Sequence, residues 1–212
     1  MQSDNRPDGQ KRLSFIEEAR RAQIVVSAQE VLAQLGYANT SLARIAESAG
    51  ISKGVISYHF AGKNELMEQV VEKIYREITT FVLARTEQEA TAAGALRTTI
   101  LSVAEFMQDH RAQLLALGEV QSNLRTPDGA RRYGMAFNEP IYHGREELLR
   151  RGQADGEFRP FDTRVMAVTV QAGLDAMFAY WVSYPDHDLH AHAVELADMF
   201  DLATRRERPG EA

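Results

Sequence analysis

The sequence predicts an all-α protein of about nine helices, in which three short helices at the front precede longer ones behind. Apolar residues recur every three or four positions along almost every segment, which is the period of a helix, and no segment alternates like a strand. Glycine and proline stand mainly between these periodic segments, where helices end. Hydrophobic residues make up 44% and charged residues 25% of the 212 residues, which is a globular composition.

The front of the chain contains three predicted helices with recognisable ends. In the first, Ile16 and Val26 lie on the stripe expected to face inward, and Gly36 is expected to end the helix as a C-terminal cap. Thr40 is expected to open the second helix, and Gly50 breaks the chain before the third. These helices are expected over residues 15–35, 40–49 and 52–60, after a polar tail over residues 1–11.

The sequence predicts two helical domains: a first domain over residues 12–62 and a second, larger one over residues 63–212. A long helix that starts at Lys63 is expected to join the two domains. Pro140 falls inside a predicted helix, and a kink is expected there because proline removes a backbone hydrogen bond and clashes with the preceding turn. The helices of this domain are expected over residues 63–94, 96–109, 112–124, 129–151, 162–184 and 188–205.

Charge is distributed unevenly along the chain. The net charge is −6, yet residues 11–63 carry seven Lys and Arg against four Glu, a local charge of +3. From residue 65 onward, sixteen Lys and Arg face twenty-four Asp and Glu, a charge of −8. A polyanion responds to charge within a Debye length, so the basic front of the chain is a candidate surface for nucleic acid.

Composition also bears on the compartment. The chain has no cysteine, which excludes disulfides and zinc–thiolate sites and fits a reducing compartment. The first residues have no apolar core that would serve as a signal peptide. The apolar run over residues 165–184 has Gln171 and Asp175 at its centre, so a core helix is expected rather than a membrane span. We therefore expect a cytoplasmic protein with no membrane partner.

The stretch TSLARIAESAGISKGVISYHF, residues 40–60, contains the motif most informative about function. It predicts two short helices joined by a tight turn at Gly50, with Ile45, Ala46 and Ile56 among the residues that pack between them. This is the helix-turn-helix arrangement, in which the second helix enters the major groove of DNA. The second helix is built from weak helix formers. Its composition is therefore better explained by a surface that fits a DNA groove than by helix stability.

The outward residues of this motif have side chains suited to DNA. Gly54 would let the backbone approach a base edge, Lys53 reaches a guanine or a phosphate, and Ser57 is a short donor to a base. The hydroxyl of Tyr58, the imidazole of His59 and the ammonium group of Lys63 suit phosphate oxygens. Thr40, at the expected start of the second helix, would present its hydroxyl and backbone N–H groups to another phosphate. The candidate DNA-binding residues are Thr40, Arg44, Ser52, Lys53, Gly54, Ser57, Tyr58, His59 and Lys63.

The front of the chain resembles the tetracycline-repressor (TetR) family of bacterial transcription regulators. The resemblance rests on Thr40, Ile45-Ala46, Ala49-Gly50-Ile51-Ser52, Gly54, Tyr58-His59-Phe60, Lys63 and Leu66. Most members have a larger residue where Ser57 stands. The resemblance implies a homodimer that binds a palindromic operator as a repressor and leaves it when a small molecule binds. It also implies a C-terminal helical domain for ligand binding and dimerisation, and no cofactor.

Several side chains of the C-terminal domain are candidates for an effector pocket. Aromatic and thioether groups would form its wall, and a few polar groups would orient the ligand, although core packing explains any one of them equally well. Lys and Arg are nearly absent from the expected inward faces, which favours a neutral or cationic apolar ligand over a phosphate-rich one. The candidates are Phe106, Met107, Leu117, Gln121, Tyr133, Phe137, Gln171, Asp175 and Phe178.

The last two predicted helices are the expected dimer interface. Small residues on one helix allow a close approach, and apolar residues on the other give the facing stripe, so two copies would form a four-helix bundle. The candidate interface residues are Ala172, Ala176, Ala179, Leu189, Ala193, Leu196 and Phe200.

Other functions are less well supported by the sequence. The stretch DHDLHAH, residues 186–192, gathers histidine and aspartate, but at a helix start this is expected to be a solvated segment and not a metal site. No nucleophile elbow, paired-carboxylate motif or phosphate loop indicates an enzyme. The alternatives that stay open are a constitutive or architectural DNA binder without an effector, and a helical scaffold or enzyme that reuses the fold.

Overall fold

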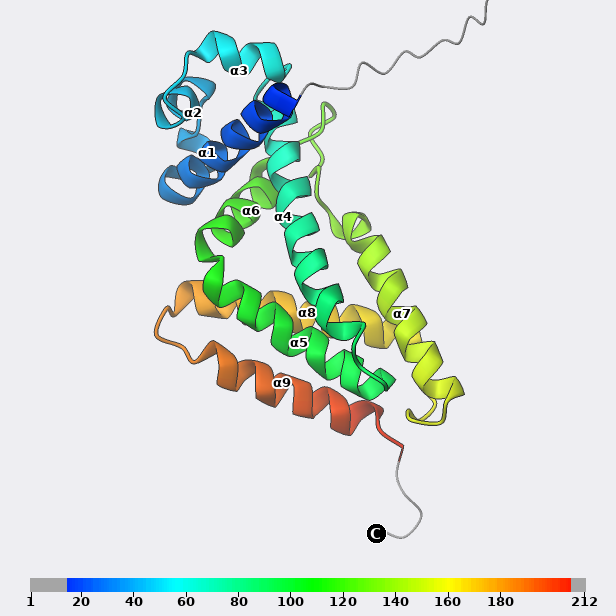
Figure 1. Cartoon of the computed structure of the whole chain (residues 1–212). Coiled ribbons are helices and arrows are strands. Elements are labelled where there is room, and N and C mark those ends of the chain that lie inside the picture. Colours follow the sequence, from blue (N-terminus) through cyan, green and yellow to red (C-terminus); the bar gives the residue numbers. More distant parts are fainter. Residues whose placement is uncertain (1–14, 207–212) are drawn as a thin grey trace, which may run out of the picture.

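The computed structural model describes residues 15–206, which form a helical protein with a small N-terminal group of helices above a larger one (Figure 1). Within this range a single 3₁₀ turn, Met135–Asn138, precedes α7, and no residue belongs to a strand. The helices are α1 Phe15–Asn39, α2 Leu42–Ser48, α3 Lys53–His59, α4 Lys63–Thr86, α5 Ala92–Asp109, α6 Arg111–Asn123, α7 Glu139–Ala154, α8 Thr163–Ser183 and α9 Leu189–Thr204. The predicted all-α fold is confirmed.

The first three helices pack around a small apolar core. Ile24 and Ala28 of α1, Ile45 of α2 and Ile56 of α3 are fully buried there, and Phe60 closes the core behind α3. The helical geometry of α1 breaks at Gly36, whose φ of 72° is in the left-handed region that glycine adopts without strain. The predicted end of the first helix at this glycine is therefore confirmed.

The prediction of which face of α1 points inward is wrong. Ile16 is 77% exposed and Val26 is 41% exposed, whereas Ile24 and Val25 are buried. The reason is that α1 lies between two partners, with α2 and α3 on one side and α6 on the other. The resulting buried surface is wider than a single stripe and is centred about one residue away from the predicted one.

Two boundaries in the C-terminal domain also differ from the prediction. The long helix α4 ends at Thr86 rather than near Gly94, because Thr91 starts a new helix by accepting a hydrogen bond from the Gly94 backbone N–H. Glu157, in the connector before α8, accepts from the backbone N–H groups of Ala92 and Ala93 at 3.1 and 2.9 Å. The first turn of α5 is thereby capped twice.

The predicted helix over residues 129–151 is confirmed only from Glu139 onward, and the expected kink at Pro140 is wrong. Residues 124–134 form an extended turn, in which the Arg132 N–H donates to the carbonyl of Leu124 at 3.0 Å and Gly129 has a φ of 88°. The helix α7 begins only at Glu139, so Pro140 lies in its first turn. A proline at that position loses no helical hydrogen bond, and no kink follows from it.

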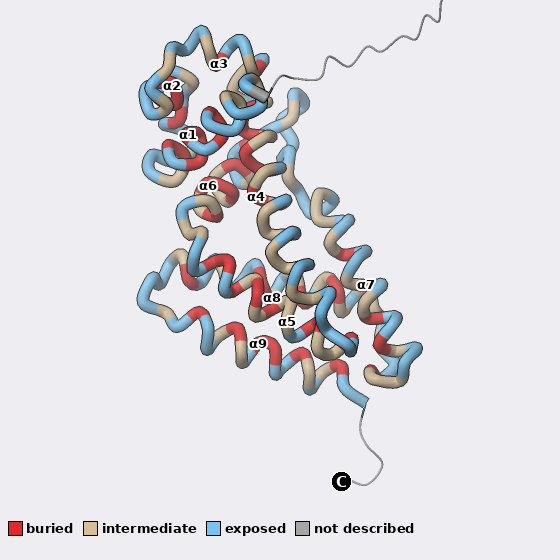
Figure 2. The backbone as a smooth tube through the Cα atoms, in the orientation of Figure 1, coloured by how far each residue is buried: buried red, intermediate tan, exposed pale blue. Residues whose placement is uncertain are grey.

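The buried core continues into the larger group of helices, where α5, α7, α8 and α9 contribute to it. Figure 2 shows the buried residues of these helices facing one another, while their outer turns are exposed. At one end, Gly152 of α7 packs directly against the ring of Phe158 and the side chain of Ala92. A side chain at Gly152 would come within 2.3 Å of that ring, so this contact requires glycine.

Candidate nucleic-acid interface and effector groove

The turn between α2 and α3 is built from backbone hydrogen bonds around Gly50. Gly50 has a φ of 66°, and the Ile51 N–H after it donates to the carbonyl of Ala46 at 3.0 Å, which ends α2. Ser52 then caps α3, with its hydroxyl accepting from the Val55 N–H at 3.4 Å. These local contacts set the direction in which α3 leaves the turn.

The outer face of α3 is exposed along its whole length (Figure 2). Lys53, Gly54 and Ser57 are exposed, and Tyr58 is 76% exposed, while Ile56 on the opposite face is fully buried. The structure therefore brings four of the predicted DNA-binding residues together on one surface of one helix. Exposed cationic, hydroxyl and aromatic side chains on one short helix make this surface a candidate binding face for DNA.

Gly54 has no packing reason to be glycine. A Cβ atom built there would meet only the hydroxyl oxygen of Ser52, at an ordinary contact distance of 3.6 Å. Its φ is also not positive, so the backbone does not require glycine either. Glycine costs about 1 kcal/mol relative to alanine inside a helix, so this residue contributes nothing to the stability of α3 and leaves its outer face without a side chain.

Tyr58 and His59 lie at the C-terminal end of α3. The Tyr58 hydroxyl donates to Oε1 of Glu17 on α1 at 3.2 Å, and its ring meets that of His59 edge-on, with centroids 5.0 Å apart. The carbonyl of His59 accepts a hydrogen bond from Arg21, whose guanidinium also lies over the ring of Phe60. Glu17 and Arg21 were missed by the sequence analysis, because only the fold brings α1 beside α3.

Thr40 does not open α2, so that prediction is wrong. Ser41 is the N-cap, and its hydroxyl accepts from the Arg44 backbone N–H at 3.3 Å. Thr40 is buried, and its hydroxyl donates to the carbonyl of Gly36 at 2.8 Å, which braces the end of α1. Arg44 is exposed on α2, with its guanidinium within 3.2 Å of the Asn39 carbonyl.

Lys63 is held by the chain itself. Its ammonium group donates to the carbonyl of Tyr37 at 2.8 Å and lies 4.0 Å from the centroid of the Tyr37 ring. Partial burial lowers the pKa of Lys63 below its ordinary value. The structure thus places Lys63 at the junction of α1 and α4, away from the outer face of α3.

The C-terminal domain has a groove lined by α4, α5 and α6. Its volume is about 440 Å³, and it is open to solvent rather than enclosed. The ring of His110 stacks on that of Phe106 with centroids 3.8 Å apart, and Phe81 meets Phe106 edge-on. The buried Oε1 of Gln113 has no hydrogen-bond partner. The lining residues are Arg76, Glu77, Thr80, Phe81, Phe106, His110 and Gln113.

Of the nine predicted effector residues, Phe106 alone is among those that line this groove. Met107 and Leu117 are buried in the core, and Phe178 packs against that core. Gln121, Tyr133 and Phe137 gather instead around Tyr75 of α4: Gln121 donates to the Tyr75 hydroxyl at 2.8 Å, and Phe137 meets both tyrosine rings edge-on. Burial raises the pKa of Tyr75 to about 12 and that of Tyr133 to about 12.

The other two predicted polar residues join a buried arginine between α7 and α8. Arg145 donates to Gln171 at 3.1 Å, and Gln171 donates to Asp175 at 2.8 Å. Burial lowers the pKa of Arg145 to about 10. The expectation that Lys and Arg are nearly absent from inward faces is therefore wrong here. Asp175 keeps an exposed edge, yet the protein around it desolvates its carboxylate and raises its pKa, mainly through burial.

The predicted dimer residues separate into two groups. Ala172, Ala176 and Ala179 of α8 are exposed. In contrast, the four predicted residues of α9 are buried within the single chain, where α9 packs mainly against α5. These four are Leu189, Ala193, Leu196 and Phe200.

The outward faces of α8 and α9 carry large apolar side chains. Tyr180 is 47% exposed, Met199 64% and Leu202 60%. Among the described residues, α8 is the one helix long and apolar enough to cross a membrane, but the same test is passed by helices of soluble proteins. Only 28% of its most apolar stretch is buried within the single chain.

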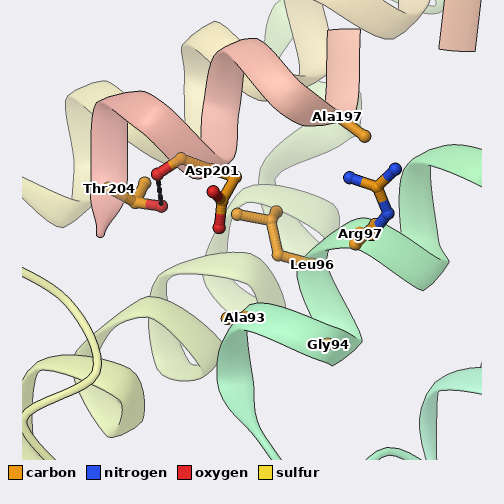
Figure 3. Close-up of a pocket in the computed structure, with 7 residues that line it drawn as sticks. All are labelled: Ala93, Gly94, Leu96, Arg97, Ala197, Asp201 and Thr204. Carbon is orange, nitrogen blue, oxygen red and sulfur yellow. Dashed lines mark hydrogen bonds between the residues drawn. The ribbon is translucent and has the colours of Figure 1, made fainter. Parts of the chain in front are cut away.

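A second, smaller cavity of about 170 Å³ lies between α5 and α9 (Figure 3). Its polar side chains are already paired, because Arg97 binds Asp198 and the Thr204 hydroxyl donates to the carbonyl of Phe200 at 2.7 Å. Ala93 and Ala197 face it from the two helices. It is a small gap in the packing between these two helices.

The histidines after α8 form no metal cluster in the described part of the chain. His187 and His192 contact one another, with 2.9 Å between Nε2 and Nδ1, and their rings lie edge-on to Tyr180. Partial burial, with His187 close by, lowers the pKa of His192. His190 is exposed on another face of the helix. The contact joins the two ends of the α8–α9 turn.

A tight glycine turn and a short exposed second helix on a three-helix core define a helix-turn-helix DNA-binding domain, followed here by a helical C-terminal domain. The sequence profile of the family described as bacterial regulatory proteins, tetR family, matches residues 24–70. The HTH-type transcriptional regulator TtgR of Pseudomonas putida is 31% identical over 182 residues, which cover 80% of this chain and 84% of TtgR. The chain belongs to the TetR family of transcriptional regulators.

Other relatives and solved structures agree with this assignment. The HTH-type transcriptional regulator BetI of Paraburkholderia xenovorans is 28% identical over 192 residues, covering 76% of this chain and 95% of BetI. The fatty acid degradation regulator FadR from Bacillus halodurans superposes with a TM-score of 0.75 at 20% identity, covering 90% of this chain and 97% of FadR. NalD of Pseudomonas aeruginosa, the secondary repressor of the MexAB-OprM multidrug efflux pump, superposes with a TM-score of 0.73 at 19% identity, covering 92% of this chain and all of NalD. At this identity the two structures show the shared fold.

Proposed function

We propose that this protein is a homodimeric repressor that binds a palindromic operator through α3 and leaves it when a small apolar molecule binds the C-terminal domain. The observation that carries this proposal is the outer face of α3, where exposed Lys53, Ser57 and Tyr58 surround a glycine that the protein's own packing does not require. A helix with such a face fits the major groove, where backbone and short side chains approach base edges closely.

On the proposed DNA face, the residues have different roles. Lys53 and Ser57 point outward from α3 and contact base edges, and Gly54 allows the close approach. Tyr58 and His59, at the end of α3, contact the phosphate backbone, and Arg44 on α2 reaches a second phosphate. Lys63 and Thr40 act indirectly, since both are bonded to the end of α1 and fix the position of α2.

The groove between α4, α5 and α6 is the proposed effector site. Its volume of about 440 Å³ is within the range of small-molecule sites. Phe81, Phe106 and His110 provide apolar and stacking surfaces for such a ligand. This site supports an effector-gated regulator over a constitutive DNA binder.

The proposed dimer interface is the outward surface of α8 and α9. The exposed alanines of α8 allow a second copy to approach closely, and Tyr180, Met199 and Leu202 would lose their solvent exposure in the dimer. Burial of this surface also accounts for the apolar character of α8, much of which stays uncovered in one chain. Operator binding requires the two-fold axis of this dimer to place the two α3 helices about 34–36 Å apart, on successive major grooves.

The proposal is tested by Lys53→Ala and Tyr58→Ala in a gel-shift assay with a duplex selected from random sequence by the native protein. Each change should weaken binding at least tenfold, since each removes a contact worth about 1–3 kcal/mol from both protomers. Far-UV circular dichroism should stay unchanged, because both side chains are exposed. Ser48→Ala, at an exposed residue in the last turn of α2, is the control. Native affinity in both variants would refute the assignment of α3.

A further inference from the structure

The end of α1 is held by a carboxylate from the other domain. Oε2 of Glu119, on α6, accepts a hydrogen bond from the backbone N–H of Tyr37 at 2.6 Å. The helical path breaks at Gly36, and a carboxylate is a strong acceptor for the N–H that follows. Gly36 also leaves room for it, because a Cβ atom there would meet Glu119 Oε2 at 3.3 Å.

Tyr37 lies four residues before Ser41, the N-cap of α2. The carbonyl of Tyr37 accepts a hydrogen bond from Lys63 at the start of α4. The backbone of Tyr37 is therefore hydrogen-bonded to both α6 and α4. Between Tyr37 and Ser41, the chain is braced further by the bond from Thr40 to the carbonyl of Gly36. A displacement of the Glu119 carboxylate therefore acts directly on the position at which α2, and then α3, begins.

The same helix reaches the proposed effector groove. His110 and Gln113, at the start of α6, line the groove, and Glu119 lies about 9 Å further along the helix axis at the usual rise per residue. In Figure 1, α6 runs from α5 to α1, and α1 and α6 are in extensive contact. A short, regular helix moves as a unit, so a shift of its first turn is carried to its last.

We infer that Glu119 is the positioning residue that couples occupancy of the groove to the placement of the DNA-binding helices. This inference rests on the proposed function, and it adds a specific route: groove, α6, Glu119, the Tyr37 backbone, α2. Coupling requires an interaction that differs between the two states, and the inference assigns that part to the Glu119–Tyr37 hydrogen bond across the domain junction.

The test uses a side chain in place of the unidentified ligand. Gln113→Trp places an indole in the groove, and its effect on operator affinity is measured by fluorescence anisotropy in three backgrounds: native, Glu119→Gln and Glu119→Ala. The amide of Glu119→Gln keeps an acceptor for Tyr37, while Glu119→Ala removes it. Glu119→Asp, which withdraws the carboxylate by one methylene, replaces Glu119→Ala if the thermal midpoint shows that the alanine variant does not fold.

Gln113→Trp should weaken operator binding at least about fivefold in the native and Glu119→Gln backgrounds. In the Glu119→Ala or Glu119→Asp background the factor should fall below about twofold. An equal factor in all backgrounds, or no effect of Gln113→Trp in the native protein, would overturn the inference while leaving DNA binding intact. Failure of the native protein to bind any selected duplex would instead remove the proposed function, and the inference with it.

Discussion

Tyr58 of α3 and Glu17 of α1 are joined by a hydrogen bond of 3.2 Å at the edge of the proposed DNA face. The bond orients the tyrosine, but it also places a carboxylate beside the expected path of the phosphates. Like charges a few ångströms apart repel by about 1 kcal/mol in water. We therefore predict that the Glu17 carboxylate lowers the affinity of this surface for DNA.

Glu17→Gln should tighten operator binding by about two- to fivefold, and more at low salt, because the amide still accepts from Tyr58 without the negative charge. The measurement is a titration by fluorescence anisotropy at two salt concentrations. Glu18→Gln is the matched control, since it changes the net charge equally but lies about 100° further around α1. Equal gains in both variants would mean that net charge, and not the position of Glu17, sets the affinity.

Replacing Gly54 by alanine should increase the stability of the protein but weaken its binding to DNA. Gly54→Ala should raise the free energy of unfolding by about 0.5–1 kcal/mol, because alanine is the better helix former and the added methyl group meets only Ser52 at 3.6 Å. The same methyl group should weaken operator binding, since it holds α3 away from the base edges. Urea denaturation and gel shift measure the two effects.

Gly144→Ala provides the comparison for Gly54→Ala. Gly144 is also exposed within a helix, α7, and a Cβ atom there has nothing within 4 Å. It should give a similar gain in stability with no change in DNA affinity. If Gly54→Ala also leaves DNA affinity unchanged, close approach of DNA is not the reason for that glycine.

The DNA-binding motif was predictable from sequence because its determinants are local. Gly50 ends α2 and Ser52 caps α3 through contacts within four or five residues, so residue type and spacing were sufficient. Thr40 shows the limit of such patterns, since Thr40 and Ser41 are both good N-caps. The choice of Ser41 depends on Thr40 being drawn inward to the carbonyl of Gly36.

The wrong predictions about which side chains are buried, and by which element, share one physical cause. Helical periodicity shows which face of a helix is apolar, but not which element covers that face. Leu189 and Ala193 do lie on an apolar stripe, and it is α5 of the same chain that buries them. Likewise Arg145 could not be placed, because its burial depends on Gln171 from the next helix. The groove residues on α4 were missed for the same reason.

The oligomeric state should distinguish the two sets of candidate interface residues. Ala176→Asp should convert the dimer to a folded monomer, because it places a charge on the exposed surface of α8 that a second copy would bury. Ala193→Asp should unfold the protein instead, since Ala193 is completely buried beside α5. Sedimentation velocity and circular dichroism separate these outcomes.

The control for the oligomeric state is Ala84→Asp, at an exposed alanine on α4, which should remain dimeric and folded. A dimer that survives Ala176→Asp would show that α8 is not the interface. Loss of DNA affinity should accompany monomer formation, since one α3 helix contacts only half of the operator.

The pH dependence of stability should reveal the desolvation of the Asp175 carboxylate. Burial raises its pKa above the ordinary value of 3.8, and this outweighs the hydrogen bond from Gln171 and the attraction of Arg145, which lower the pKa. Between these two pKa values the folded chain binds more protons at this group than the unfolded chain does. The contribution of Asp175 is therefore present below pH 3.8 and is lost as pH rises through the raised pKa.

Asp175→Asn should make the protein more stable than the native one at pH 7, with a difference that shrinks as pH falls toward 3.8. The asparagine Oδ1 still accepts from Gln171, so the hydrogen bond is kept. Asp128→Asn is the control of opposite sign, because the Thr126 hydroxyl lowers the pKa of Asp128. Urea unfolding from about pH 3.5 to 7 measures both, and parallel curves for native and Asp175→Asn protein would contradict a desolvated carboxylate.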